Sequence, residues 1–421
     1  MIALTNDLEI DYNIIEMNVE WNDSDENELI MHTIHAYPAK FPAFIASKAF
    51  KYAETEGVKI KTVADIFCGC GTVALEARNN NFDFWGCDIN PVATLIAKTK
   101  SSNFDIKKCE ALFEEILLEY KNVELTNNAF ENANKRLKYW FTENSYISLL
   151  KIYNAINNIQ DQLYQDAFKC IFSSILKISS KWLTKSIKPQ IDPNKKEIDV
   201  MKHFKLQYKK FIKAVNEISN HTTKTMINCH NFLTENNLPK VDMVITSPPY
   251  VTSYEYADLH QLSSLWLGYT DDYRSLRKGS IGSIYNSDDF ILDFESLNQT
   301  GIHIVRELMK DGKPTAKIKS IARYYADMQK AVEKCKLMLN NNGMVFFVVG
   351  DTEYKGVKIK NSQHLYEAML RNGFQDIKIG KRTISRGICT PYRDESGKFT
   401  KNKNLKKVYH EEFIISGRVY E

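Results

Sequence analysis

A short series of apolar segments and glycines between residues 62 and 88 constrains the fold most. Residues 62–67 read as an apolar strand, residues 68–72 (CGCGT) as a tight glycine turn, residues 73–79 as a helix and residues 82–87 as a second strand. A strand, turn, helix and strand within about 30 residues are typical of a right-handed βαβ unit. The series therefore predicts an α/β fold with a mostly parallel, Rossmann-like sheet.

The middle of the chain follows a different pattern. Apolar residues recur three and four apart in residues 113–120, 146–156 and 167–178, which is the spacing of amphipathic helices. Strand patterns return as VDMVIT, MVFFVV and EEFIIS, and we expect the sheet to resume at Val241. The sequence thus predicts two halves of one α/β domain, residues 1–108 and 226–421, separated by a largely helical insertion at 109–225.

The glycine turn, defined as residues 68–72, has the layout of a nucleotide-type binding site. Gly69 and Gly71 allow a sharp turn and a close approach to a ligand, and Asp88 ends the next strand about 20 residues later, where an acid suits ribose hydroxyls. A dinucleotide site needs a third glycine, whereas position 74 is Ala, and Asp65 would repel a pyrophosphate. The pattern favours S-adenosylmethionine, although a G-x-G turn and a strand-end acid also occur without any ligand.

The TSPPY loop, residues 246–250, follows the apolar segment VDMVI. Two consecutive prolines remove two backbone donors and stiffen the loop, so that its carbonyl groups and the Ser247 hydroxyl can accept hydrogen bonds from an amino group. The Tyr250 ring can stack on a flat base that has left its duplex. The alternative is a Pro-Pro strand terminator followed by a core tyrosine.

These motifs together resemble a known family. DIFCGCGT, GCDINP and TSPPY are similar to motifs of the DNA amino-methyltransferases, which methylate cytosine N4 or adenine N6, and HAYPAKFP (residues 35–42) resembles a segment that closes the methionine pocket in one branch. The resemblance covers about two thirds of the chain. It implies that residues 1–108 hold the cofactor-binding half of a methyltransferase domain and residues 226–421 the catalytic half. The cofactor residues that it implies are Tyr37, Lys40, Phe41, Asp65, Phe67, Gly69, Gly71, Thr72, Asp88 and Ile89, and the target residues are Ser247, Pro248, Pro249 and Tyr250.

The resemblance also addresses the target base. In the family a serine before Pro-Pro is common in N4-cytosine enzymes, so Ser247 favours cytosine over adenine. Where the family often has an acid near the cofactor adenine, this chain reads Cys229-His230-Asn231, and His230 or Asn231 could serve instead. No proline is followed by cysteine, as the covalent route to 5-methylcytosine would need. The rival interpretations are an adenine N6 enzyme, an RNA amino-methyltransferase and a catalytically silent nucleic-acid-binding module.

Composition limits the partners. The net charge is only +4, but residues 181–224 are rich in lysine, and a second basic tract follows at residues 274–282, so either region could contact double-stranded DNA. A restriction endonuclease would be the cognate partner if the chain were the modification half of a restriction system.

No apolar run is long enough for a membrane span, and we expect a cytoplasmic protein with reduced cysteines. Cys68 and Cys70 alone make a weak zinc signal, and we expect no metal.

Overall fold

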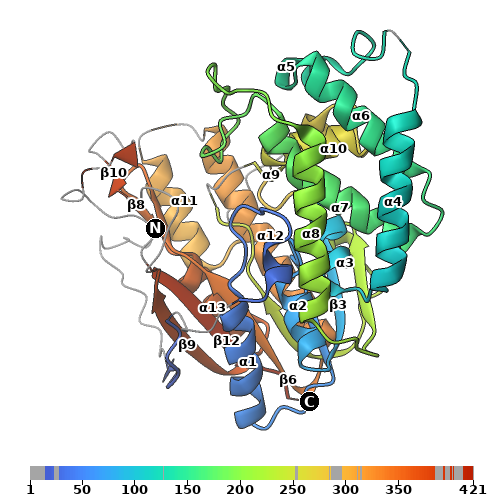
Figure 1. Cartoon of the computed structure of the whole chain (residues 1–421). Helices are drawn as coiled ribbons and strands as arrows, with labels where there is room; N and C mark the ends of the chain where they lie inside the picture. The colour runs from blue at the N-terminus through green and yellow to red at the C-terminus, as the bar shows by residue number, and fades with distance from the viewer. Residues whose placement is uncertain are drawn as a thin grey trace.

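A computed structural model gives the fold of the chain. It describes residues 15–22, 28–126, 128–251, 255–283, 285, 296–310, 312, 315–384, 392–393, 399–400, 402 and 411–420. Figure 1 shows the path of the chain, with the helical elements of the middle third gathered on one side of the molecule. Within the described residues, no helix combines the length and the apolar character that crossing a membrane requires.

An eight-stranded sheet forms the centre, in the order β1-β9-β12-β6-β5-β2-β3-β4. Its strands are β1 (Ile15–Glu16), β2 (Thr62–Asp65), β3 (Asp83–Asp88), β4 (Thr225–Cys229), β5 (Val241–Thr246), β6 (Leu339–Val349), β9 (Gln375–Thr383) and β12 (Glu411–Arg418). β12 lies antiparallel between β6 and β9, whereas the other described pairings are parallel. The prediction of a mostly parallel, Rossmann-like α/β sheet is therefore confirmed.

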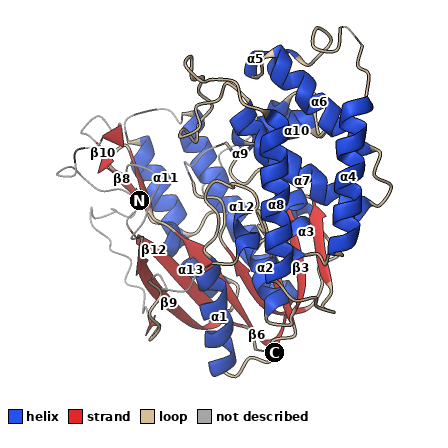
Figure 2. Cartoon of the chain, viewed as in Figure 1, coloured by secondary structure: helices blue, strands red, loops and turns tan. Residues whose placement is uncertain are grey.

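Helices cover both faces of this sheet (Figure 2). On one face lie α1 (Ala43–Thr55) and α2 (Thr72–Asn79), and on the other α11 (Gln299–Met309), α12 (Ala316–Met338) and α13 (Asn361–Arg371). Successive residues of β5 alternate between the two clusters, with Met243 and Ile245 on the α1 face and Val244 on the α12 face. Burial on both faces explains why this strand reads as a continuous apolar run.

The helical region packs beside α3 (Pro91–Ser101). It comprises α4 (Ile106–Asn122), α5 (Lys135–Trp140), α6 (Glu143–Asn157), α7 (Gln162–Ser179) and α8 (Val200–Glu217). Their apolar faces share one hydrophobic cluster with Leu95 and Ile96 of α3 and with Leu262 and Trp266. The helices thus bury a core continuous with the α/β part of the chain.

The expectation that the sheet resumes at Val241 is wrong, because β4 begins at Thr225 and pairs with β3 in parallel. Its sequence, TMINC, is short and polar at an edge of the sheet, so it lacks the apolar run of the central strands. The remaining elements are the 3-10 turns η1 (Ile30–Thr33), η2 (Phe232–Thr234) and η3 (Tyr273–Arg277), the short helices α9 (Tyr256–Leu259) and α10 (Gln261–Trp266), and the paired strands β7 (Thr352–Tyr354) with β8 (Val357–Ile359) and β10 (Tyr392–Arg393) with β11 (Phe399–Thr400).

Candidate active site

The two motifs meet where the strand order reverses. β2, which precedes the glycine turn, lies next to β5, which precedes the TSPPY loop, and the chain continues from these strands toward opposite edges of the sheet. The Thr246 hydroxyl donates a 2.6 Å hydrogen bond to Asp65 Oδ1 across this boundary. The carboxyl ends of strands at such a switch point are where open α/β sheets bind ligands.

The glycine turn needs both of its glycines. Gly69 and Gly71 have φ angles of +48° and +75°, in the left-handed region that favours glycine. A Cβ on Gly71 would also lie 2.6 Å from both Cα and Cβ of Ala97, so α3 packs directly against the turn. The turn is therefore a backbone surface that no side chain at these two positions covers.

Two carboxyl groups flank the turn: Asp65 is buried, and Asp88 is half-buried. Asp88 Oδ2 accepts a 2.9 Å hydrogen bond from the Gly69 amide and Oδ1 a 2.8 Å bond from the Asn90 amide. Burial raises the pKa of Asp88 to about 6, and it raises the pKa of Asp65 to about 7 although Thr246 and the Phe67 amide hydrogen-bond to that carboxylate. A ligand that carries a positive charge or donates hydrogen bonds would stabilise the ionised form of both carboxyl groups.

Unsatisfied polar atoms mark the same place. Thr72 Oγ1 at the start of α2 and Asn90 Nδ2 before α3 are buried and have no hydrogen-bond partner within the described part of the chain. Buried polar groups in native proteins are nearly always paired, so these atoms need a ligand or water. An open glycine turn, two carboxylates and two unpaired polar groups fit the amino acid and ribose parts of S-adenosylmethionine.

Ile89 and Asn231 lie together on the neighbouring side of the turn. Asn231 Nδ2 donates a 3.1 Å hydrogen bond to the Gly279 carbonyl, and a Cβ on Gly279 would collide with Ile89. The basic tract therefore covers the residue that the resemblance assigns to the cofactor adenine. His230 instead pairs with Glu235 at 3.0 Å, so of the two candidates for that contact Asn231 is the one beside Ile89.

The segment 35–42 reaches the turn through its tyrosine. Tyr37 lies beside Gly69, since a Cβ there would be 3.6 Å from Tyr37 Cε1, and its ring stacks on His260 at a centroid distance of 5.0 Å. Lys40 forms an ion pair with Glu28, and Phe41 packs with the apolar cluster on the α1 face. Phe67 packs edge to face on Phe232, 6.4 Å between centroids. Within segment 35–42, the described contact to the glycine turn is that of Tyr37.

The TSPPY loop holds its tyrosine in a fixed place. The Tyr250 hydroxyl donates a 2.7 Å hydrogen bond to Glu412 Oε1 on β12, and Arg382 Nε on β9 donates a 2.6 Å bond to the other oxygen of Glu412. Gly350 gives the ring its space, because a Cβ there would lie 3.2 Å from Tyr250 Cε2. Ser247, Pro248 and Pro249 connect this ring to the end of β5. The loop is thus braced from two strands that lie far away in sequence.

Sequence reasoning missed the residues that support the site. Arg382 stands in no motif, and the strand patterns EEFIIS and MVFFVV did not single out Glu412 or the adjoining Gly350 for a role. His260 is buried beside Tyr37: burial lowers its pKa to about 3, and Nε2 has no partner within the described residues. The contacts of these residues with the TSPPY loop cannot be recognised in one sequence. Only the folded chain brings β6, β9 and β12 to the loop.

The cysteines of the glycine turn point to different sides. Cys68 packs in the cluster on the α1 face, whereas Cys70 packs with the helical region and accepts a 3.4 Å hydrogen bond from Lys100 Nζ. In the part of the chain that the structure describes, no three His, Cys, Asp or Glu side chains gather closely enough to hold a metal ion. The two thiols therefore serve as packing groups on either side of the turn.

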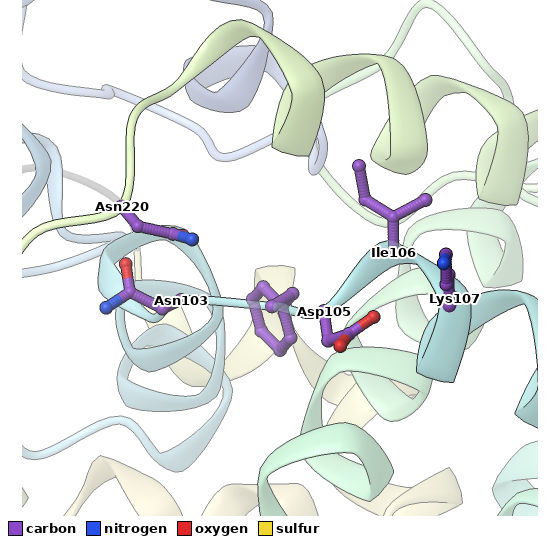
Figure 3. Close-up of a pocket in the computed structure, with 6 residues that line it drawn as sticks. Asn103, Asp105, Ile106, Lys107 and Asn220 are labelled. Carbon is purple, nitrogen blue, oxygen red and sulfur yellow. The ribbon is translucent and has the colours of Figure 1, made fainter.

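A separate pocket lies away from these residues. It has a volume of about 490 Å³ and is lined by residues 103–107, between α3 and α4, together with Asn220 (Figure 3). These residues precede β4, so the pocket is at the amino ends of the strands, opposite the glycine turn and the TSPPY loop. Neither predicted motif contributes to it.

Known proteins resemble this chain at low sequence identity. A scan against known protein families finds no match. Type II methyltransferase M.MvaI of Kocuria varians is 25% identical over 363 residues, which cover 78% of this chain and 79% of the relative. Among solved structures, two of the rRNA methyltransferase aviRa from Streptomyces viridochromogenes, each 9% identical, align over 92% and 82% of this chain and 89% and 92% of theirs, with TM-scores of 0.29 and 0.26.

At such scores the fold assignment rests on the strand order and not on these two structures. The relative in Kocuria varians carries the functional comparison, because its likeness extends over more than three quarters of both chains. The chain is therefore similar over most of its length to a protein described as a type II methyltransferase.

Proposed function

We propose that the chain is an S-adenosylmethionine-dependent DNA methyltransferase of the amino class, and that its target is the exocyclic N4 of cytosine. The observation that carries the proposal is the Thr246–Asp65 hydrogen bond, which joins the strand of the glycine turn to the strand of the TSPPY loop. A donor site and an acceptor site for one group transfer must adjoin, and this bond makes the two motifs neighbours. The likeness to the type II methyltransferase of Kocuria varians supports methyl transfer. DNA as the substrate follows from the resemblance of the motifs to DNA amino-methyltransferases, and a restriction endonuclease as a functional partner is part of the same proposal.

The cofactor residues have distinct proposed roles. The ribose would hydrogen-bond to Asp88, and the ammonium of the methionine part would lie near the Asp65 carboxylate, which a nearby cation would help to ionise. The Thr72 hydroxyl and the amides at the start of α2 are donors for a carboxylate. The adenine would be enclosed by Ile89, Asn231 and Gly279. Tyr37 would cover the glycine turn, and Lys40 and Phe41 belong to the segment that positions Tyr37.

The target residues act on the amine of a flipped base. When bound, S-adenosylmethionine supplies a methyl group on a sulfonium centre, which an amine can attack without a covalent enzyme intermediate. Ser247 and the carbonyl groups held by Pro248 and Pro249 would accept hydrogen bonds from the amine and orient its lone pair. Tyr250, braced by Glu412, would stack on the base. The methylated nitrogen then loses a proton to water.

Nucleoside mass spectrometry of DNA from cells that express the protein tests the proposal. We expect N4-methylcytosine, and we expect Ser247→Ala to lower the rate of methyl transfer with little change in DNA affinity. N6-methyladenine in its place would reject the base assignment and retain the mechanism. Detection of 5-methylcytosine would reject the mechanism, because the TSPPY loop offers no thiol for the adduct that carbon methylation requires.

A further inference from the structure

A second pocket lies between α5 of the helical region and the start of the basic tract, with Leu265 of α10 in its lining. Its volume is about 570 Å³, within the range of sites that bind small organic groups. Lys135, Arg136 and Tyr139 of α5 line one wall, and Asp271, Tyr273 and Arg274 line the other. Arginine, carboxylate and tyrosine side chains therefore face one cavity.

Arg136 is held in a defined orientation. Its Nε donates a 2.7 Å hydrogen bond to Gln261 Oε1, and the fully buried Gln261 accepts a second bond, 2.9 Å, from Trp140 Nε1. The guanidinium carbon lies 4.9 Å from the centre of the Tyr139 ring and 5.5 Å from that of Tyr273. An arginine fixed through Nε and flanked by aromatic rings keeps its two terminal nitrogens for a ligand.

The pocket is mechanically connected to the TSPPY loop. Gln261 Nε2 donates a 2.8 Å hydrogen bond to the Asp258 carbonyl on α9, the first helix after that loop. Arg277 donates to both carboxylate oxygens of Asp258, at 2.7 Å and 2.9 Å, which ties η3 to the same helix. Arg136 is therefore linked through Gln261 to α9, the helix that follows the target loop in the chain.

The lining favours a base over a phosphate. Arg274 is already bidentate with Asp272, with Nη2 2.9 Å from Oδ2, and the charge of Asp271 offsets that of Lys135, so Arg136 is the one uncompensated cation among the described residues of the lining. A guanine presents acceptors at O6 and N7 in the major groove, which an arginine can contact with two nitrogens. Tyr139, 47% exposed, offers a stacking face.

We propose that this pocket recognises a guanine of the DNA substrate through Arg136, and so contributes to sequence choice. The inference rests on the proposed function, because it assumes that DNA is bound at the TSPPY loop. Direct readout by Arg136 predicts that loss of the guanine acceptor and loss of the arginine affect the same interaction, so their effects should not add.

The test uses the full chain and DNA containing its methylated site, with each guanine of that site replaced in turn by 7-deazaguanine, which lacks the N7 acceptor. We expect the wild-type kcat/KM to fall about 10-fold at one position, as a lost bidentate base contact implies. Arg136→Ala and Arg136→Lys should show a similar loss on normal DNA and no further loss at that position. The matched control is Lys138→Ala on the same helix, whose Nζ donates to the Glu131 carbonyl, and it should behave like the wild type.

Each possible outcome decides for or against the inference. Loss of sensitivity at one guanine in both Arg136 variants, with unchanged cofactor binding and thermal midpoint, supports the inference. Equal weakening on every substitution would mean a phosphate contact or a structural role and would overturn it, as would full wild-type discrimination in the variants. If the wild-type protein methylates no DNA at all, the proposed function fails first, and this outcome is distinct because no variant is needed to observe it.

Discussion

The Asp65 side chain is buried at the end of β2, where its ionised form is poorly solvated. Burial is the main cause that raises its pKa from the model-peptide value of 3.8 to about 7, while hydrogen bonds from Thr246 and the Phe67 amide oppose the rise. Because the folded chain holds this proton more tightly than the unfolded chain does, the associated stability is fully present below about pH 4. It is lost as the pH rises through about 7.

Asp65→Asn should therefore flatten the pH dependence of stability. Between pH 4 and pH 8 the wild-type free energy of unfolding should fall by up to about 4 kcal/mol more than that of the variant, given about 1.4 kcal/mol per pKa unit. Asp88 titrates in both proteins and does not contribute to the difference. Urea unfolding at several pH values measures it, and parallel profiles for the two proteins would contradict the assigned burial.

Tyr250 combines a stacking surface with an anchored hydroxyl. Tyr250→Ala should weaken DNA binding by roughly 1 to 3 kcal/mol through lost base stacking, whereas Tyr250→Phe keeps the ring and should lose much less. Both variants should bind S-adenosylmethionine like the wild type. Fluorescence anisotropy with a labelled duplex measures the effect, and the loss should shrink on a duplex mismatched at the target base. Equal losses for Ala and Phe would show that the hydroxyl bond to Glu412, and not stacking, is what matters.

At the scale of elements, α8 has two kinds of lysine. Lys202, Lys205, Lys209 and Lys213 are exposed, at spacings that place them along one side of the helix. Lys210, in contrast, donates to the Thr33 carbonyl, and Gln207 donates to the Ile34 carbonyl. These contacts fasten α8 to η1, which leads into the segment that carries Tyr37.

Changing Lys205, Lys209 and Lys213 together to Gln should weaken binding to all DNA sequences alike. If this face follows the phosphate backbone, the slope of log affinity against log salt should fall by up to about three units, roughly 0.9 for each contact. Lys210→Gln is the matched control, and it should disturb cofactor affinity more than the salt slope. An unaltered slope in the triple variant would show that the exposed face is only solvated and would leave DNA contact to the basic tract.

The central elements were predictable because their patterns are strong. The expected helix at residues 73–79 agrees with α2, the expected strands at 82–87 and 241–246 agree with β3 and β5, and the middle third is helical as its periodicity indicated. β4 escaped notice because TMINC is polar at an edge of the sheet, and β9 because lysine and arginine interrupt its apolar alternation. Such strands are defined by their neighbours, which the local sequence does not contain.

The candidate site divides in the same way. The sequence singled out Gly69 and Gly71 as turn residues. The structure explains both, because their φ angles are positive and because Ala97 leaves no room for a Cβ at position 71. The Thr246–Asp65 bond and the Tyr250–Glu412–Arg382 chain join residues at least 30 positions apart, and for Tyr250 and Glu412 the separation is 162. Contacts of that kind depend on the order of strands in the sheet, which no local pattern encodes.

At the scale of the whole molecule, the helical region and the target loop share aromatic packing. Trp266, at the end of α10, lies 4.9 Å from the ring of Tyr146 and 5.6 Å from that of Phe172, and 5.8 Å from Phe141. All three partners belong to the inserted helices or the turn between them, while α10 belongs to the segment that follows the TSPPY loop. The helical region is therefore packed directly against α10, which follows the TSPPY loop in the chain.

The position of β12 affects how the protein is made on the ribosome. β12 is the last strand of the sheet in chain order, yet it lies between β6 and β9, so two inward strand edges stay unpaired until residues 411–418 have been synthesised. A chain that stops after residue 410 should therefore expose both edges and aggregate, which sedimentation of truncated and full-length protein made in a cell-free system would reveal. Equal solubility of the two products would contradict this expectation. The nascent chain also lacks Glu412 until β12 has been made, so Tyr250 acquires its hydrogen-bonded brace only after that strand has been synthesised.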